Sequence, residues 1–220
     1  MQLTTPVDQS VSADFYVIDG FDNDASVVAS LHGQGRHVGC YLSVGSYEDW
    51  RPDAASFPAA VLGKSNGWPG ERWLDIRRLD LLGPIMEARL DMCRAKGYDA
   101  VDPDNVDGYT NATGFPLTAA DQLAYNRFIA DAAHVRGMAV GLKNDLDQVA
   151  TLAPSFDFSV NEQCFEYSEC NLLTPFVAAG KPVFNIEYRG DPAVICPQAR
   201  SLGLLSQMKR LSLDAWRTVC

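Results

Sequence analysis

Residues 100–108 read Ala100-Val101-Asp102-Pro103-Asp104-Asn105-Val106-Asp107-Gly108. This stretch opens as a short apolar run and then becomes abruptly acidic. A short apolar run predicts a strand that is covered on both faces, as in a parallel sheet. Barrels built from such strands carry their chemistry at the C-terminal strand ends. We therefore expect residues 100–102 to form a central strand whose end presents functional carboxyl groups.

Similar short apolar runs recur along the whole chain. They predict strands at residues 15–18, 38–42, 73–76, 100–102, 139–142, 158–160, 183–186 and 202–205. Helical patterns alternate with them, and the clearest spans residues 119–136, with Thr118 as N-cap and Asp121 three residues later. Residues 43–72, rich in Gly, Pro and Trp, predict a long functional loop after the second strand.

Strands that alternate with helices predict an α/β fold. Eight such units in 220 residues form a compact version of the (β/α)8 TIM-type barrel, whose usual size is about 250 residues. We therefore predict a single barrel domain over residues 1–220. The competing fold is an open doubly wound sheet, but no G-x-G-x-x-G motif follows the first strand, so its nucleotide-binding form lacks its fingerprint.

Composition narrows the classes of partner. Apolar residues make up 47% of the chain and charged residues 21%, which excludes a disordered chain or a coiled coil. The net charge of −10 disfavours nucleic-acid binding, which needs a basic surface. No apolar run approaches the roughly 18 residues of a membrane helix. We expect a monomer with neither a nucleic-acid nor a membrane partner.

Six cysteines point to an oxidising compartment. The even count fits disulfides, whereas the absence of CxxC and the presence of only three His argue against a structural zinc site. We predict the pairs Cys164–Cys170 and Cys196–Cys220. For Cys40 and Cys93, a bridge and two buried thiols remain open. We therefore expect a secreted protein, although residues 1–5 show no signal peptide, so the leader is expected to have been removed or trimmed.

Nearly every predicted strand ends in a carboxylate or an amide. The residues that follow or close the strands include Asp19, Tyr41, Asp75, Asp102, Asp104, Lys143, Asn144, Asn161, Glu162, Glu187 and Tyr188. No His belongs to this set. The reaction class that uses two carboxyl groups without a cofactor is glycoside hydrolysis. A calcium loop at residues 102–108 is not supported, because Val106 and Asp107 occupy positions where the pattern needs Asp or Asn and then Gly. We expect no cofactor and no metal.

The ordered motifs resemble those of a known family. They are Cys40-Tyr41-Leu42-Ser43, Trp68-Pro69-Gly70-Glu71-Arg72-Trp73, Asp102-Pro103-Asp104-Asn105-Val106-Asp107-Gly108-Tyr109, Gly141-Leu142-Lys143-Asn144-Asp145, Asn161-Glu162-Gln163-Cys164 and Asn185-Ile186-Glu187-Tyr188. Together they resemble glycoside hydrolase family 114, the endo-α-1,4-polygalactosaminidases, over residues 14–220. The resemblance implies a (β/α)8-type barrel, secretion and hydrolysis of α-1,4-linked galactosamine polymers.

The resemblance also assigns the catalytic pair. It matches the family's catalytic Asp to Asp104 and its catalytic Glu to Glu162. The strand ends alone do not choose between Asp104 and Asp102. We expect Asp104 to act as nucleophile and Glu162 as acid/base, in a retaining mechanism that needs carboxyl groups about 5–5.5 Å apart.

The amino-sugar polysaccharide is the expected partner. Substrate-binding residues are expected to be Asp19, Tyr41, Asp102, Asn105, Lys143, Asn144, Glu187 and Tyr188. Asp19, Asp102 and Glu187 would form an acidic rim that attracts the ammonium groups of a deacetylated polymer. Two alternatives remain: a non-catalytic barrel that only binds amino-sugar polymers, and a metal-dependent hydrolase.

Overall fold

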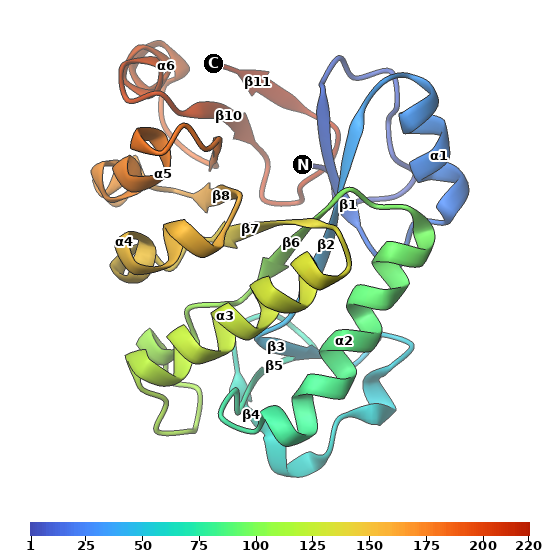
Figure 1. The fold of residues 1–220 in the computed structure, drawn as a ribbon. Coiled ribbons are helices and arrows are strands. Elements are labelled where there is room, and N and C mark those ends of the chain that lie inside the picture. The colour runs from blue at the N-terminus through green and yellow to red at the C-terminus, as the bar shows by residue number, and fades with distance from the viewer.

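Parallel strands form the centre of the structure, a computed structural model that describes residues 1–220 (Figure 1). The main sheet has the strand order β1-β2-β6-β7-β8-β9-β10-β11. Its strands are β1 (Phe15–Asp19), β2 (His37–Ser43), β6 (Ala100–Asp104), β7 (Ala139–Lys143), β8 (Phe158–Glu162), β9 (Val183–Glu187), β10 (Leu205–Lys209) and β11 (Arg217–Val219). All pair in parallel except β11, which is antiparallel to β10.

Helices lie around the outside of the curled sheet (Figure 1). They are α1 (Ala25–Gly33), α2 (Leu79–Lys96), α3 (Ala119–Val135), α4 (Val149–Leu152), α5 (Thr174–Ala178) and α6 (Pro192–Ser201). Short 3-10 turns are η1 (Ala54–Ser56), η2 (Ala59–Val61), η3 (Gly108–Thr110), η4 (Leu146–Gln148), η5 (Ala153–Ser155) and η6 (Cys170–Leu173). The predicted helix α3 is confirmed, and Thr118 and Asp121 form a reciprocal capping box at its start.

The prediction that residues 73–76 form the third barrel strand is wrong. Residues 71–74 instead form β5 (Glu71–Leu74), the middle strand of a small antiparallel sheet with β3 (Ser46–Glu48) and β4 (Leu62–Ser65). This sheet lies in the connection between β2 and α2, and β2 pairs directly with β6. A short apolar run does not reveal its pairing partner, because the partner is set by contacts distant in sequence.

The last predicted strand, residues 202–205, is also misplaced. Helix α6 continues to Ser201, and Gly203 follows with a φ of +73°, a left-handed conformation that glycine adopts without strain. The strand therefore begins only at Leu205.

The strand ladder is linear, so the expected closed barrel is not formed by strand pairing. The structure is a single α/β domain with a curled, mostly parallel sheet of eight strands. Gln2 forms an isolated parallel bridge with Ile18, and the Leu3 N–H donates to the carbonyl of Leu213. The first residues of the chain therefore lie between β1 and the segment after β10.

Aromatic side chains fill the inside of the curled sheet near the start of the strands. Phe15, Phe158 and Phe184 pack with ring centroids 5.3–5.9 Å apart. Gly141 is required here, because a Cβ at this position would lie 2.4 Å from the Phe158 ring. Side chains two residues apart share one face of a strand, so the inward row continues along β8 from Phe158 through Val160 to Glu162. An apolar floor thus supports polar side chains at the C-terminal strand ends.

Three disulfides link the elements. Cys164–Cys170 and Cys196–Cys220 are the two pairs expected from sequence, and Cys40–Cys93 joins β2 to α2. The alternative of two buried thiols at Cys40 and Cys93 is therefore wrong.

None of the helices combines the length and apolar character needed to cross a membrane.

Candidate active site

Asp104, Lys143 and Glu162 close the neighbouring strands β6, β7 and β8. The ammonium nitrogen Nζ of Lys143 lies 2.9 Å from Asp104 Oδ1 and 3.2 Å from Glu162 Oε1. The Lys143 side chain is buried, whereas both carboxylates remain partly open to solvent. The lysine thus lies between two carboxylates that reach the surface of the strand ends.

Asp104 is held in its ionised form. Burial by itself raises its pKa, but the charge of Lys143 and the hydrogen bonds from Lys143, Tyr41 and Asn105 together outweigh burial, so the pKa of Asp104 lies below its ordinary value. The Lys143 ammonium, the Tyr41 hydroxyl at 2.8 Å and the Asn105 N–H at 2.8 Å all donate to this carboxylate. An ionised and oriented carboxylate is the form that a nucleophile requires.

Lys143 stays protonated although it is buried. Burial lowers the pKa of Lys143, but the negative charges of Asp104, Glu162 and Asp102 raise it well above its ordinary value. A buried ammonium with carboxylate neighbours cannot serve as a base. Its positive charge is a fixed feature of the site.

We call the cavity around these groups the Lys143 pocket. It encloses about 230 Å³, and its lining residues are Leu3, Tyr41, Trp68, Glu71, Asp104, Asn105, Lys143, Glu162, Tyr188, Leu211, Ser212 and Leu213. Burial is the largest cause that raises the pKa of Tyr41 and of Tyr188, and each also interacts with a carboxylate, Asp104 and Glu162 respectively. Both tyrosines therefore remain neutral hydrogen-bond donors.

Asn105 connects the site to the β2–β3 turn. Its side-chain NH₂ donates to Ser43 Oγ at 2.8 Å and to Ser46 Oγ at 3.2 Å. Gly45 permits this close approach, because a Cβ there would lie 1.6 Å from the Asn105 carbonyl oxygen. The Asn105 backbone, at a φ of +64°, is thereby fixed where its N–H meets Asp104.

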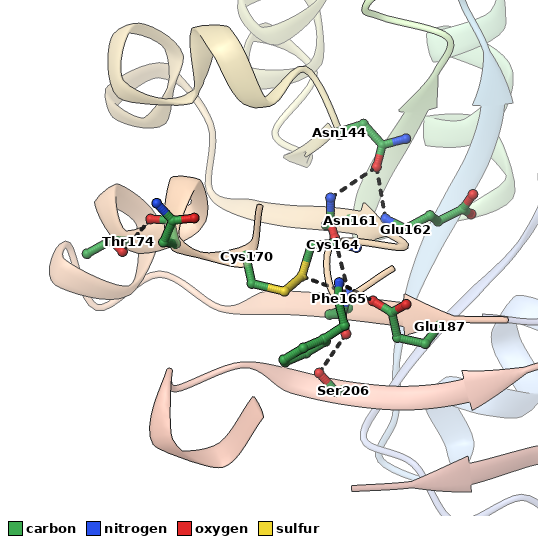
Figure 2. Close-up of a disulfide and its surroundings, with 11 residues drawn as sticks. Asn144, Asn161, Glu162, Cys164, Phe165, Cys170, Thr174, Glu187 and Ser206 are labelled. Carbon is green, nitrogen blue, oxygen red and sulfur yellow. Dashed lines mark hydrogen bonds between the residues drawn. A yellow bond between two sulfur atoms is a disulfide. The ribbon is translucent and has the colours of Figure 1, made fainter. Parts of the chain in front are cut away.

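Glu162 is positioned by its backbone. Figure 2 shows its N–H donating to Asn144 Oδ1 at 2.9 Å, while its side chain points away from the Cys164–Cys170 disulfide. The two cysteines are six positions apart in sequence, so the disulfide closes a short loop directly after β8. Cys164 N–H also donates to Asn161 Oδ1, so the chain that leaves Glu162 is anchored on both sides.

Asp102 lies beneath the site rather than on its rim. It is fully buried, and neither of its carboxyl oxygens has a hydrogen-bond partner. Burial raises the pKa of Asp102 to about 7, Lys143 opposes this rise, and Asp104 and Glu162 add to it. The structure thus distinguishes the buried Asp102 from Asp104, which is partly open to solvent. The positions of the two residues at the strand end did not make this distinction.

Asp19 and Glu187 are also absent from the rim. Asp19 is buried in a two-point ion pair with Arg51, at 2.7 and 3.0 Å, and accepts the N–H groups of Phe21 and Asp22. Glu187 is fully buried and accepts from the Phe165 N–H at 3.0 Å (Figure 2). The expected rim of Asp19, Asp102 and Glu187 is therefore wrong, because all three support the fold from below the surface.

A second cavity adjoins the Lys143 pocket, and Glu162 is the one residue that lines both cavities. We call it the acidic pocket. It encloses about 350 Å³, and its lining residues are Asp107, Tyr109, Thr110, Asn144, Asp145, Leu146, Asp147, Glu162, Gln163, Tyr167 and Glu169. Glu162 ends β8, and the segments after β6, β7 and β8 supply all the other lining residues. Asn144, which was expected to bind substrate, thus lines the acidic pocket and not the Lys143 pocket.

Sequence reasoning did not single out several pocket residues. Trp68 and Glu71 stand in one of the quoted family motifs but had no expected role, and Asp147, Tyr167 and Glu169 lie in connections whose path depends on tertiary contacts. Trp68 is 53% exposed and lines the Lys143 pocket. Trp73, by contrast, is buried beside Gly108 and lines neither pocket.

The chain is similar to several known proteins. The sequence profile of glycoside-hydrolase family GH114 matches residues 1–220. An uncharacterized protein of Deinococcus radiodurans is 31% identical over 229 residues, which span 90% of this chain and 73% of that protein.

Two solved structures share the fold. The crystal structure of Aspergillus fumigatus Ega3 in complex with galactosamine is 44% identical, with a TM-score of 0.90 over 97% of this chain and 90% of that one. The glycoside hydrolase domain of PelA from Pseudomonas aeruginosa is 16% identical, with a TM-score of 0.75 over 98% of this chain and 94% of that one. At that identity, the PelA likeness concerns the fold alone.

Proposed function

This chain belongs to glycoside hydrolase family GH114, and from that premise we propose that it hydrolyses α-1,4-linked galactosamine polymers with Asp104 and Glu162 as its catalytic pair. The observation that carries the proposal is the pair of carboxylates on either side of Lys143 Nζ, at the rim of a cavity. The 44% identity to Ega3, a protein solved with galactosamine, supports the choice of amino sugar.

In the proposed first step, Asp104 attacks the anomeric carbon while Glu162 donates a proton to the glycosidic oxygen. The carbon–oxygen bond to the leaving sugar breaks, and a covalent bond from Asp104 to the remaining sugar forms. Glu162 then removes a proton from water, which attacks the same carbon and frees Asp104. Lys143 and the Tyr41 hydroxyl hold Asp104 in position throughout.

The spacing of the carboxylates supports a retaining outcome. Asp104 Oδ1 and Glu162 Oε1 contact the same ammonium nitrogen at 2.9 and 3.2 Å. These two oxygens are therefore closer to each other than roughly 6.5 Å, which is the smallest separation of the two carboxyl groups in inverting enzymes. A separation below that range supports direct attack by Asp104 over attack by a water molecule held between the two carboxyl groups.

The remaining expected site residues divide by pocket. We propose that Tyr41, Asn105, Lys143 and Tyr188 contact the sugar that Asp104 attacks, because all four line the Lys143 pocket. The exposed ring of Trp68 is suited to stack on a sugar face at the edge of the same pocket. Asn144, in the other pocket, holds the backbone of Glu162.

We propose that the protein is secreted and acts as a monomer. Three disulfides support an oxidising, extracellular location.

Digestion of purified, deacetylated α-1,4-galactosamine polymer tests the proposal. We expect soluble oligosaccharide fragments by mass analysis, the same fragments with a chelator present, and none from Asp104→Asn. Binding of the polymer without any fragment would favour the non-catalytic barrel. Activity abolished by chelator and restored by a divalent metal would favour a metal-dependent hydrolase.

A further inference from the structure

Two exposed tryptophans lie on the connection between β2 and α2, beside the Lys143 pocket. Trp68 is one of the residues that line the pocket, whereas Trp50 has no part in the proposed mechanism. Trp68 is 53% exposed and Trp50 is 52% exposed. A single exposed apolar residue is ordinary on a protein surface, so the pair is informative only if the two residues form one surface.

The antiparallel pairing of β3 with β5 brings the two tryptophans together. Trp50 lies just after β3, and Trp68 lies just before β5. Beyond the last ladder pair, the Asp49 N–H donates to the Gly70 carbonyl at 3.1 Å. The Trp50 ring lies against Gly70, because a Cβ on that glycine would be 2.9 Å from Trp50 Cζ3. The ring of Trp50 therefore packs on the turn that carries Trp68.

Trp50 also lies on the side of the sheet that carries the catalytic pair. The guanidinium of Arg51 lies 5.8 Å from the centre of the Trp50 ring and 5.0 Å from that of Phe21. The same guanidinium donates two hydrogen bonds to Asp19, which ends β1. The C-terminal ends of parallel strands share one side of a sheet, and this side carries the chemistry. The two tryptophans thus extend the Lys143 pocket toward the end of β1.

The surroundings of Trp50 hold its ring in place. Arg51 is buried, and its ion pairs with Asp19 and Glu48, at 2.7 and 2.8 Å, fix the guanidinium beside the ring. A ring that rests on a fixed cation and on the Gly70 backbone loses little freedom when a ligand covers it. The exposed part of Trp50 is therefore a preorganised aromatic surface.

We propose that Trp50 and Trp68 form a tryptophan platform that binds the sugars on the non-reducing side of the attacked sugar. This inference rests on the proposed function. Trp68 lines the Lys143 pocket, where the attacked sugar lies, and it does not line the acidic pocket beyond Glu162. The platform therefore continues the Lys143 pocket in the direction away from the leaving group.

The chemistry of an amino-sugar chain suits the platform. One face of a hexosamine ring carries C–H groups, which pack on an indole ring, and an ammonium group is attracted to the same ring face. Contacts with these remote sugars add binding energy without touching the reacting atoms. The platform therefore favours a long chain over a single sugar.

The test uses two substrates with the same leaving group. One is an aryl α-galactosaminide, which reaches only the Lys143 pocket. The other is the aryl α-glycoside of an α-1,4-galactosamine tetrasaccharide, whose remaining sugars extend over the platform. Release of the aryl group is measured for Trp50→Ala and Trp50→Phe. The matched control is Trp216→Ala, because Trp216 is 43% exposed and lines neither pocket.

The expected loss is specific to the longer substrate. We expect Trp50→Ala to lower its kcat/KM about fivefold to tenfold, the usual order for a lost aromatic contact, and to leave the single-sugar substrate unchanged. Trp50→Phe keeps an aromatic ring and should retain most of the activity on the longer substrate, and Trp216→Ala should change neither.

Three results would overturn the inference and leave the proposed function intact. They are equal losses on both substrates in Trp50→Ala, no loss on the longer substrate, and a loss of the same size in Trp216→Ala. Failure of the unmodified enzyme to release the aryl group from either substrate would instead overturn the proposed function.

A binding measurement needs no turnover. The chain has four tryptophans, so the Asp104→Asn variant gives four indole N–H signals by NMR. We expect the galactosamine tetrasaccharide to shift the signals of Trp50 and Trp68, and galactosamine alone to leave Trp50 unshifted. The buried Trp73 and the exposed Trp216 serve as internal references. A Trp50 signal that the tetrasaccharide leaves unmoved would contradict the platform.

Discussion

Asp104 and Glu162 lie on either side of one buried ammonium, with Asp104 Oδ1 at 2.9 Å and Glu162 Oε1 at 3.2 Å from Lys143 Nζ. The three side chains end neighbouring parallel strands, and two of these strands start on an apolar floor inside the curled sheet. The fold thus fixes the distance between two carboxylates that belong to segments 58 positions apart in sequence. That relationship makes several outcomes testable.

Removing either carboxylate should abolish turnover without unfolding the protein. We expect Asp104→Asn and Glu162→Gln each to lower kcat by several orders of magnitude, because general acid catalysis alone contributes roughly 10²–10⁴. Both substitutions preserve size, so circular dichroism and the melting temperature should change little. More than about a tenth of the activity in either variant would reject the assignment.

Lys143 should set the acid limb of the pH profile. Its charge lowers the pKa of Asp104, which must be ionised to attack. In Lys143→Met the pKa of Asp104 rises, so activity is lost at a higher pH as the solution is acidified. Lys143→Arg keeps the charge and should move the limb less. The pH dependence of kcat/KM measures both, and an unmoved limb in Lys143→Met would refute this role.

Asp19 should affect stability and not substrate binding. Its ion pair with Arg51 is buried, with side chains 5% and 4% exposed. Breaking a buried pair costs about 3–5 kcal/mol when the partner charge is left uncompensated. The loss here should fall below that range, because Glu48 still contacts Arg51 at 2.8 Å. We expect Asp19→Asn to lower the free energy of unfolding, measured in urea, with KM unchanged. A raised KM at full stability would return Asp19 to the substrate site.

The disulfides should differ in their contribution to stability. Their sequence separations are 53 for Cys40–Cys93, 24 for Cys196–Cys220 and 6 for Cys164–Cys170. Loop-closure entropy then predicts losses of roughly 4, 3.5 and 2 kcal/mol for the paired Cys→Ala variants. Only the shortest loop adjoins Glu162, so only its removal should also lower kcat. Urea unfolding and kinetics on the three double variants check this order.

The sequence predicted the fold class well because its signals were local. The short apolar runs at β1, β2, β6, β7, β8 and β9 each lie within one buried strand, and the Thr118–Asp121 box marks the start of α3 from neighbouring residues alone. Strand pairing is not local. Nothing near Trp73 shows that its strand pairs with residues 46–48 instead of with β2.

The site residues, too, are only partly predictable from local sequence. The motifs predict Asp104 and Glu162 as the catalytic pair, but the depth of a side chain depends on the whole fold. Asp19, Asp102 and Glu187 occur at strand ends in sequence, yet burial and hydrogen bonding remove them from the surface. The acids that do line a cavity, such as Asp147 and Glu169, lie several residues beyond the strand ends, on loops whose course no short pattern predicts.

Time-resolved proton NMR of the digestion tests whether Asp104 acts as nucleophile and Glu162 as acid. Deacetylated α-1,4-galactosamine polymer is mixed with the enzyme, and the anomeric signals of new reducing ends are recorded before mutarotation. Attack by Asp104, with Glu162 as acid, predicts that α-anomeric reducing ends appear first and that β signals grow only later. New reducing ends that are initially β would contradict the two-step mechanism, and the absence of new reducing ends would contradict the proposed activity itself.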